Sequence, residues 1–96
     1  MTAYIVFTRE STTDQLEMDI YSSQVGPTFA GHPVTVLAAY GALDVLEGEP
    51  IEGAVIVSFP SIAEAKAWYK SPAYQEVAVH RFAGARYRAF IVDGIA

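Results

Sequence analysis

The chain has 96 residues, of which 52% are hydrophobic and 18% charged, which fits one folded domain, residues 1–96, and excludes a disordered chain. Six basic against eleven acidic residues give a net charge of −5, which disfavours nucleic acid as a partner. The absence of cysteine excludes disulfides and thiol chemistry, and the lack of a long apolar run or a basic leader predicts a cytoplasmic protein that does not enter the membrane.

The first 25 residues predict a strand followed by a helix. Residues 3–8 form a continuous apolar run, which is typical of a strand covered on both faces. Asp14 or Thr13 is placed to cap a helix. In that helix the apolar residues recur at helical spacing: Leu16, Met18, Ile20, Tyr21 and Val25.

The next segment predicts a break, a second strand and an irregular excursion. Gly26-Pro27 interrupts the helix, and Gly31 is a candidate for a left-handed C-cap before the stop at Pro33. Residues 34–39 predict the second strand, and residues 40–49 predict a hairpin-like or irregular connection.

The stretch after residue 52 predicts a third strand and a helix directly behind it. Residues 53–59 form the strand, which ends at Pro60 because proline lacks a ladder donor. Ser61 and Glu64 have the spacing of a capping box. The helix then turns one apolar arc towards the sheet, made of Ile62, Ala65, Trp68 and Tyr69.

Ser71-Pro72 predicts that a second helix starts after a bend, since serine caps and proline fits the first helical position. Its inward face repeats at i, i+3, i+4 and i+7: Tyr74, Val77, Ala78 and Arg81. We expect a turn at Ala83-Gly84 and a last strand over residues 86–92.

The order β-α-β-β-α-β predicts an α+β, ferredoxin-like domain with a four-stranded antiparallel sheet. Helices on one face leave the other face bare, and the strands carry apolar residues at both parities. Those residues include Ile5, Phe7, Val55, Val57, Phe90 and Val92. Because such a surface is too large for a soluble monomer, the strands predict a homodimer that pairs sheet face to sheet face.

The segment Phe59–Gln75, with Val45–Gly48 upstream and Val92–Gly94 downstream, resembles the DUF1330 family, and the likeness covers nearly the whole chain. The resemblance implies a dimeric α/β barrel of ferredoxin-like subunits, with ligands between the helix layer and the sheet, and no settled activity. The chain departs from the family pattern twice. Pro33-Val34 stands where relatives commonly have Gly-Gly, and Ala39-Tyr40-Gly41 where they often have Arg-Gly-Gly.

His32 and Glu47 are the candidate catalytic residues. Histidine titrates near neutrality and is suited to a general base, and a partly buried glutamate orients a histidine or acts as a base itself. The alternatives are a histidine placed at a helix C-terminus and a charged residue in a loop.

The candidate ligand-binding residues are aromatic or basic: Tyr21, Tyr40, Trp68, Tyr69 and Arg88. Tyr40 would replace the arginine of relatives as a polar group. The spacing of Trp68 and Tyr69 is also explained by core packing alone.

Two functions remain open at this point. The first is an enzyme without a cofactor that transfers protons on a small, largely apolar molecule; the second is a binding or accessory protein that holds such a molecule in the same cavity. The two histidines have no paired spacing, which predicts no metal site, and no phosphate loop, Gly-x-Gly-x-x-Gly or nucleophile elbow is present.

Overall fold

The structure, a computed structural model, describes residues 1–96 and contains four strands and four helical segments. In chain order these are β1 (Ala3–Thr12), α1 (Gln15–Gln24), the 3₁₀ turn η1 (Gly26–Phe29), β2 (Thr35–Ala39), β3 (Gly53–Phe59), α2 (Ile62–Tyr69), α3 (Pro72–Gly84) and β4 (Ala85–Asp93).

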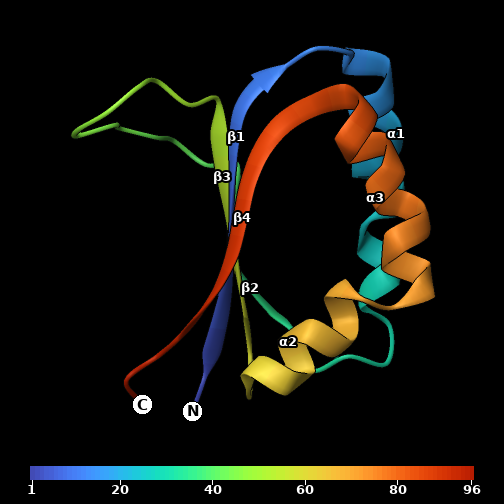
Figure 1. The fold of residues 1–96 in the computed structure, drawn as a ribbon, viewed down its shortest axis with the longest axis vertical. Coiled ribbons are helices and arrows are strands. Elements are labelled where there is room, and N and C mark those ends of the chain that lie inside the picture. The colour runs from blue at the N-terminus through green and yellow to red at the C-terminus, as the bar shows by residue number, and fades with distance from the viewer.

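The strands form one sheet in the order β2-β3-β1-β4, with every neighbouring pair antiparallel. Figure 1 views this sheet on edge, with all helices on one side and the other face bare. The predicted α+β, ferredoxin-like topology is therefore confirmed. No helix is long and apolar enough to cross a bilayer.

Side-chain caps fix where the three α-helices begin. Asp14 accepts hydrogen bonds from the amides of Leu16 and Glu17, so of the two predicted candidates, Asp14 and Thr13, Asp14 is the cap of α1. The hydroxyl of Ser61 accepts from the Glu64 amide at the start of α2. The hydroxyl of Ser71 caps α3 in the same way, with Pro72 at the first helical position.

The core is organised around Trp68, whose side chain is almost fully buried. The rings of Phe29 and Phe59 stack on it at centroid distances of 5.0 and 5.9 Å, and Phe7 meets it edge-on at 6.4 Å. Its indole N–H donates to the hydroxyl of Thr28 at 3.1 Å, which satisfies the single polar atom of the ring. The tryptophan therefore joins α2 to η1 and to the sheet.

Three details differ from the sequence expectations. Ala83 and Gly84 belong to α3 rather than to a turn, and β4 starts at the next residue. At the end of α3 the Ala85 amide donates to the Arg81 carbonyl, and the Gly84 carbonyl accepts from the amides of Thr13 and Asp14, which ties the helix end to the start of α1. In α1 Met18 and Tyr21 face the core, whereas Leu16 is 75% exposed.

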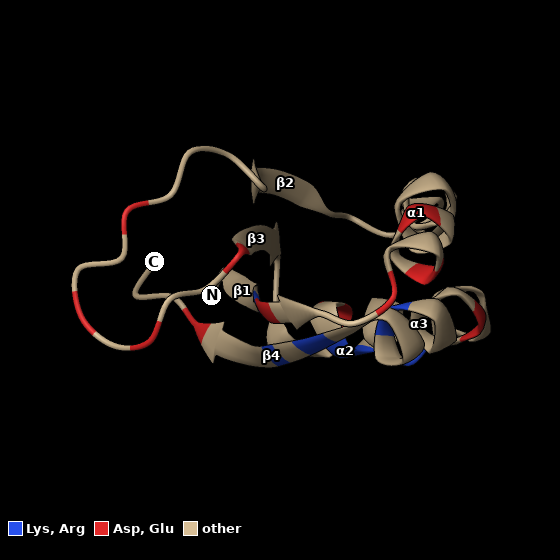
Figure 2. Cartoon of the chain, turned by 90° about the horizontal axis from the view of Figure 1, so that it is seen from above, with Lys and Arg blue, Asp and Glu red and all other residues tan.

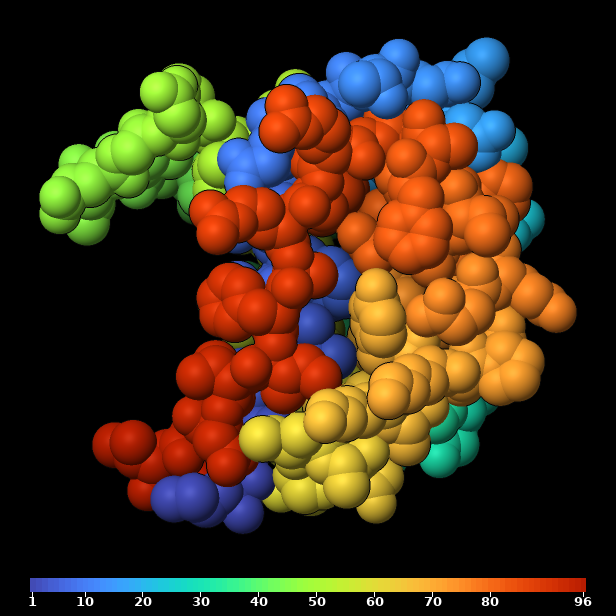
Figure 3. All heavy atoms as spheres, in the orientation of Figure 1, coloured from blue at the N-terminus to red at the C-terminus, as the bar shows by residue number.

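The open face of the sheet is apolar at its centre. Val6 pairs in register with Phe90 on one side and Ile56 on the other. Each of the three residues alternates with core-facing neighbours of its own strand, so all three side chains lie on the open face. Phe90 is 52% exposed. Figure 3 shows this face hollowed between the projecting β2–β3 connection and the chain ends.

The β2–β3 connection, residues 40–52, is irregular, one of the two forms predicted for residues 40–49, and it is almost wholly exposed. Figure 2 shows it extending away from the sheet with acidic residues along it, while the basic residues gather on β4 and the helices beside it. Charge is thus unevenly distributed along the molecule.

Candidate functional site

An apolar pocket lies between the helix layer and the sheet, with a volume of about 170 Å³. We call it the aromatic pocket, and it is lined by Phe7, Tyr21, Val25, Phe29, Val36, Ala39, Tyr40, Val55, Val57, Trp68 and Tyr87. These residues come from all four strands, from α1 and α2 and from η1, so the pocket exists only in the folded domain.

A chain of hydrogen bonds reaches the pocket from inside the core. The Nε of Arg81 donates to the hydroxyl of Tyr74 at 3.2 Å, and this hydroxyl lies 2.9 Å from that of Tyr21. Arginine has only donors, so Tyr74 accepts from it, and either phenol can supply the proton of the Tyr21–Tyr74 hydrogen bond. When Tyr74 is the donor of that bond, the proton of Tyr21 is free for a molecule in the pocket.

Burial sets the protonation of these phenols. It raises the pKa of Tyr21 strongly and also raises the pKa of Tyr74, although Arg81 acts in the opposite direction on Tyr74. Burial likewise raises the pKa of Tyr87. All three side chains are therefore neutral hydrogen-bonding groups at physiological pH.

Tyr40 forms the rim of the pocket. Its backbone φ of 56° lies in the left-handed region, and its ring crosses Gly53, where a β-carbon would stand only 2.6 Å from the ring. Its hydroxyl bonds to that of Tyr87, and the Arg9 guanidinium lies 4.9 Å from the ring centroid. Glycine at position 53 therefore makes room for the ring at the pocket mouth.

Glu52 holds Arg9 in place over that ring. One carboxylate oxygen of Glu52 lies 3.1 Å from Nε of Arg9 and accepts from the Thr12 hydroxyl at 2.6 Å. The hydrogen bond from Thr12 lowers the pKa of this carboxyl, with a smaller contribution from the arginine. Arg9, Thr12 and Glu52 thus form a polar cluster at the end of β1 that holds the rim of the pocket in place.

The structure places the sequence candidates in different parts of the molecule. Tyr21, Tyr40 and Trp68 line the aromatic pocket, whereas Tyr69 lies outside it, beside β4. His32 is half-buried and is absent from the pocket wall. Glu47 is exposed in the β2–β3 connection, where it borders a groove together with Arg88. The pocket gives no support to the roles suggested for His32, Glu47 and Arg88, which stay predictions.

The sequence reasoning missed two groups that shape the site. Tyr74 was expected only as core, yet its hydroxyl carries the contact between Arg81 and Tyr21. Tyr87 was not singled out, although it lines the pocket and bonds to Tyr40. An arginine at an inward helical position was the available signal for the first group, because a buried guanidinium needs polar partners.

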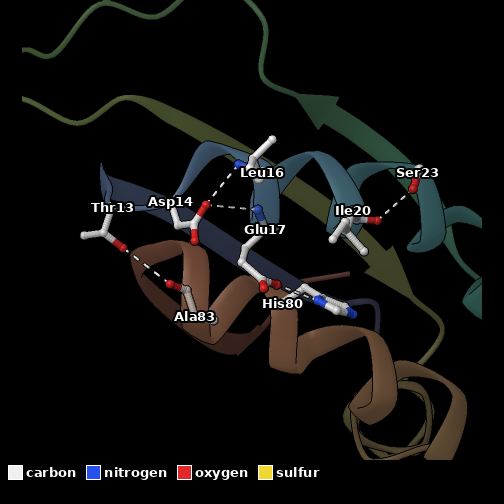
Figure 4. Close-up of polar contacts among 8 residues, drawn as sticks. All are labelled: Thr13, Asp14, Leu16, Glu17, Ile20, Ser23, His80 and Ala83. Carbon is white, nitrogen blue, oxygen red and sulfur yellow. Dashed lines mark hydrogen bonds and ion pairs between the residues drawn. The ribbon is translucent and has the colours of Figure 1, made fainter.

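His80 has a partner that lies away from the pocket. Its Nδ1 is 2.6 Å from Oε2 of Glu17, so the pair connects α3 to α1 (Figure 4). The hydroxyl of Thr13 adds a weak bond to the Ala83 carbonyl beside it. These contacts serve the packing of the two helices. No three His, Asp or Glu side chains gather in a way that could hold a metal ion.

The fold is similar to that of several solved structures. RPA0582, a protein of unknown function from Rhodopseudomonas palustris, has a TM-score of 0.75 and 21% identity over 99% of this chain and 83% of its own. A dimeric ferredoxin-like protein of unknown function from Bacteroides fragilis has a TM-score of 0.69 and 11% identity over 97% and 96% of the two chains.

SnoaB, a cofactor-independent oxygenase from Streptomyces nogalater, has a TM-score of 0.55 and 12% identity over 99% of this chain and 92% of its own. At these identities the similarities show a shared ferredoxin-like fold. No protein with a curated description matches the sequence. The model of the domain of unknown function DUF1330 matches residues 2–95, and the chain therefore belongs to the DUF1330 family.

Proposed function

We propose that this protein is a homodimer that binds a small, flat, largely apolar molecule in the aromatic pocket. The observation that carries the proposal is the pocket itself, whose volume of about 170 Å³ is bounded entirely by apolar and aromatic side chains. A dry cavity of about 150 Å³ in another protein holds benzene, so a single substituted ring is the appropriate size.

The hydrogen-bond chain behind the pocket adds a polar requirement. Tyr21 is held by Tyr74, which accepts from Arg81, and when Tyr74 donates to Tyr21 the proton of Tyr21 is free for an acceptor. A carbonyl or ether oxygen on the ring supplies that acceptor. A ligand such as an aryl ketone accepts a hydrogen bond from Tyr21, whereas a pure hydrocarbon offers no acceptor.

Binding is favoured over proton transfer because the pocket wall contains no carboxylate, imidazole or amine. Its ionisable groups are phenols, and those of Tyr21 and Tyr87 have pKa values raised by burial. A general base must lose its proton near the working pH, and such phenols do not.

The test is a titration with acetophenone, followed by the fluorescence of Trp68, the only tryptophan, which lies in the pocket wall. Val36→Phe adds a ring at the β2 side of the pocket and is expected to weaken binding at least tenfold. Val79→Phe is the matched control, because Val79 lies on α3 away from the pocket wall and is 53% exposed, against 50% for Val36. Equal binding by wild type and Val36→Phe, or no binding by wild type, contradicts the proposal.

A second candidate function is catalysis without a cofactor, for which Tyr21 is the supporting observation. A fixed neutral donor stabilises negative charge that develops on a substrate oxygen, and the similar fold of SnoaB accommodates a cofactor-independent oxygenase. The same two variants test this function. Catalysis is favoured if oxygen uptake with a small hydroquinone is seen in wild type and in Val79→Phe but is lost in Val36→Phe. If wild type shows no uptake, catalysis is excluded for that substrate class.

A further inference from the structure

The β2–β3 connection carries charges of one sign together with exposed apolar side chains. It contains no lysine or arginine, and its acidic residues are Asp44, Glu47, Glu49 and Glu52. Leu46 is 89% exposed, and Leu43 and Val45 beside it are exposed as well and lie outside the core. Neighbouring apolar side chains on a segment outside the core are typical of a surface that contacts another chain.

The start of β4 carries the opposite charge on the open sheet face. Arg86 and Arg88 are exposed, and they alternate with Tyr87, which lines the aromatic pocket on the helix side, so both arginines lie on the open face. They border shallow grooves together with Glu10 and Glu49 of the same chain. Neither arginine takes part in an ion pair within the subunit. Both positive charges are therefore available to a second chain.

The sheet topology can bring these two surfaces of opposite charge together in a face-to-face dimer. With the strand order β2-β3-β1-β4, a two-fold axis parallel to the strands places β4 of one subunit opposite β2 of the other. Because all neighbouring strands are antiparallel, the end of β2 and the start of β4 lie at the same end of the sheet. The β2–β3 connection leaves β2 at that end and projects away from the helices (Figure 1). With this axis it reaches the start of β4 in the partner.

We infer that the β2–β3 connection of each subunit docks on the start of β4 in a second copy of this chain, with Glu47 and Glu49 facing the partner subunit's Arg86 and Arg88. The inference rests on the homodimer of the proposed function and adds the orientation of its two subunits. Carboxylates and guanidinium groups form charge-assisted, often bidentate hydrogen bonds, and their attraction grows where a subunit contact excludes water. The two-fold symmetry forms the contact twice. Glu47 and Arg88, which do not line the aromatic pocket, thereby act in assembly.

Charge reversal tests the contact, with the mass of the full chain measured by light scattering at micromolar concentration. One variant combines Glu47→Arg with Glu49→Arg, and the other combines Arg86→Glu with Arg88→Glu. Each variant places like charges across the interface, so each is expected to weaken the dimer at least tenfold while circular dichroism shows a native fold. A wild-type dimer that neither variant weakens overturns the inference and leaves the homodimer in place. A wild-type monomer overturns both.

A mixture of the two variants separates contacts between subunits from contacts within one subunit. In a mixed dimer the reversed β2–β3 connection meets the reversed β4, and the original connection meets the original β4. The equimolar mixture is therefore expected to regain the dimer mass. If the charges interact only within each subunit, mixing restores no pair, and a mixture that stays monomeric overturns the inference.

Two controls on the helix side match these variants. Lys66→Glu combined with Lys70→Glu changes the net charge as much as the arginine reversal, at exposed positions in and directly after α2, and is expected to change the dimer affinity less than twofold. Leu46→Ala is expected to weaken the dimer at least threefold, whereas Leu16→Ala, at a 75% exposed position of α1, should leave it unchanged. Equal weakening by the lysine and arginine reversals, or by the two leucine variants, overturns the assigned contact.

Discussion

At the scale of single residues, the hydroxyl of Tyr21 determines which oxygen-bearing ligands the pocket prefers. Tyr21→Phe keeps the ring and removes the hydroxyl that bonds to Tyr74 and that we propose donates to the ligand. We expect acetophenone binding to weaken about twofold to twelvefold, the value of one net hydrogen bond of ~0.5–1.5 kcal/mol. Ethylbenzene binding should change less than twofold. Fluorescence titration of both ligands checks this expectation.

Tyr69→Phe is the matched control, because it removes a hydroxyl outside the aromatic pocket. A similar loss of acetophenone binding in both variants would assign the effect to something other than the Tyr21 donor.

The raised pKa values of the buried tyrosines predict how the folding stability depends on pH. Since folding raises the pKa of Tyr21 and Tyr74 above 10.0, the stability linked to their neutral forms is present below pH 10 and is lost as the pH rises above it.

Residue chemistry was only partly predictable from the sequence. Helical spacing placed Trp68 and Tyr74 on inward faces, and the structure confirms both as core. Spacing does not show which hydroxyls meet, because Tyr40 and Tyr87 are 47 residues apart and come together through the sheet. Whether His32 lines the pocket also depends on tertiary structure, and the residue type alone does not predict it.

At the scale of elements, the contact between α1 and α3 depends on Gly84. A β-carbon there would lie 3.0 Å from the Asp14 carbonyl oxygen, from Cβ of Glu17 and from Cγ of Met18. Gly84→Ala is expected to reduce the free energy of unfolding by about 1–2 kcal/mol, because overpacking forces α1 away from α3. Gly41→Ala has open space around it and should stay within about 0.5 kcal/mol. Urea unfolding curves of the three proteins measure the differences; equal stability of both variants would show that the helices adjust without cost.

Most elements were predictable because their end signals are local. Ser61, Ser71-Pro72 and Asp14 each marked a helix start that the structure confirms. The end of α3 was missed because its contacts are long-range: the Gly84 carbonyl accepts from the amides of Asp14 and Thr13, which are 70 and 71 residues away. Strand β1 runs beyond the apolar run to Thr12 because its polar end pairs with the start of β4.

At the scale of the whole molecule, the open sheet face predicts self-association. Val6, Ile56 and Phe90 form its apolar centre, and several proteins of the same fold are described as dimeric. We expect light scattering at micromolar concentration to give about twice the chain mass of 10.4 kDa. Phe90→Glu should yield a folded monomer, because it places a charge in the buried face.

Val79→Glu is the control for that experiment, as Val79 is similarly exposed but lies on α3. It should remain dimeric. A wild-type monomer that is stable at micromolar concentration would contradict the dimer, and a monomeric Val79→Glu would move the interface to the helix side.

The strand order leaves β4 with a partner on one side only. Its other edge therefore presents unpaired backbone along a strand of nine residues, which is a template for the addition of foreign strands and for aggregation. Arg86 and Arg88 place positive charge along this strand. Such charges are a common protection of exposed sheet edges, so the chain carries its own safeguard against edge-to-edge association.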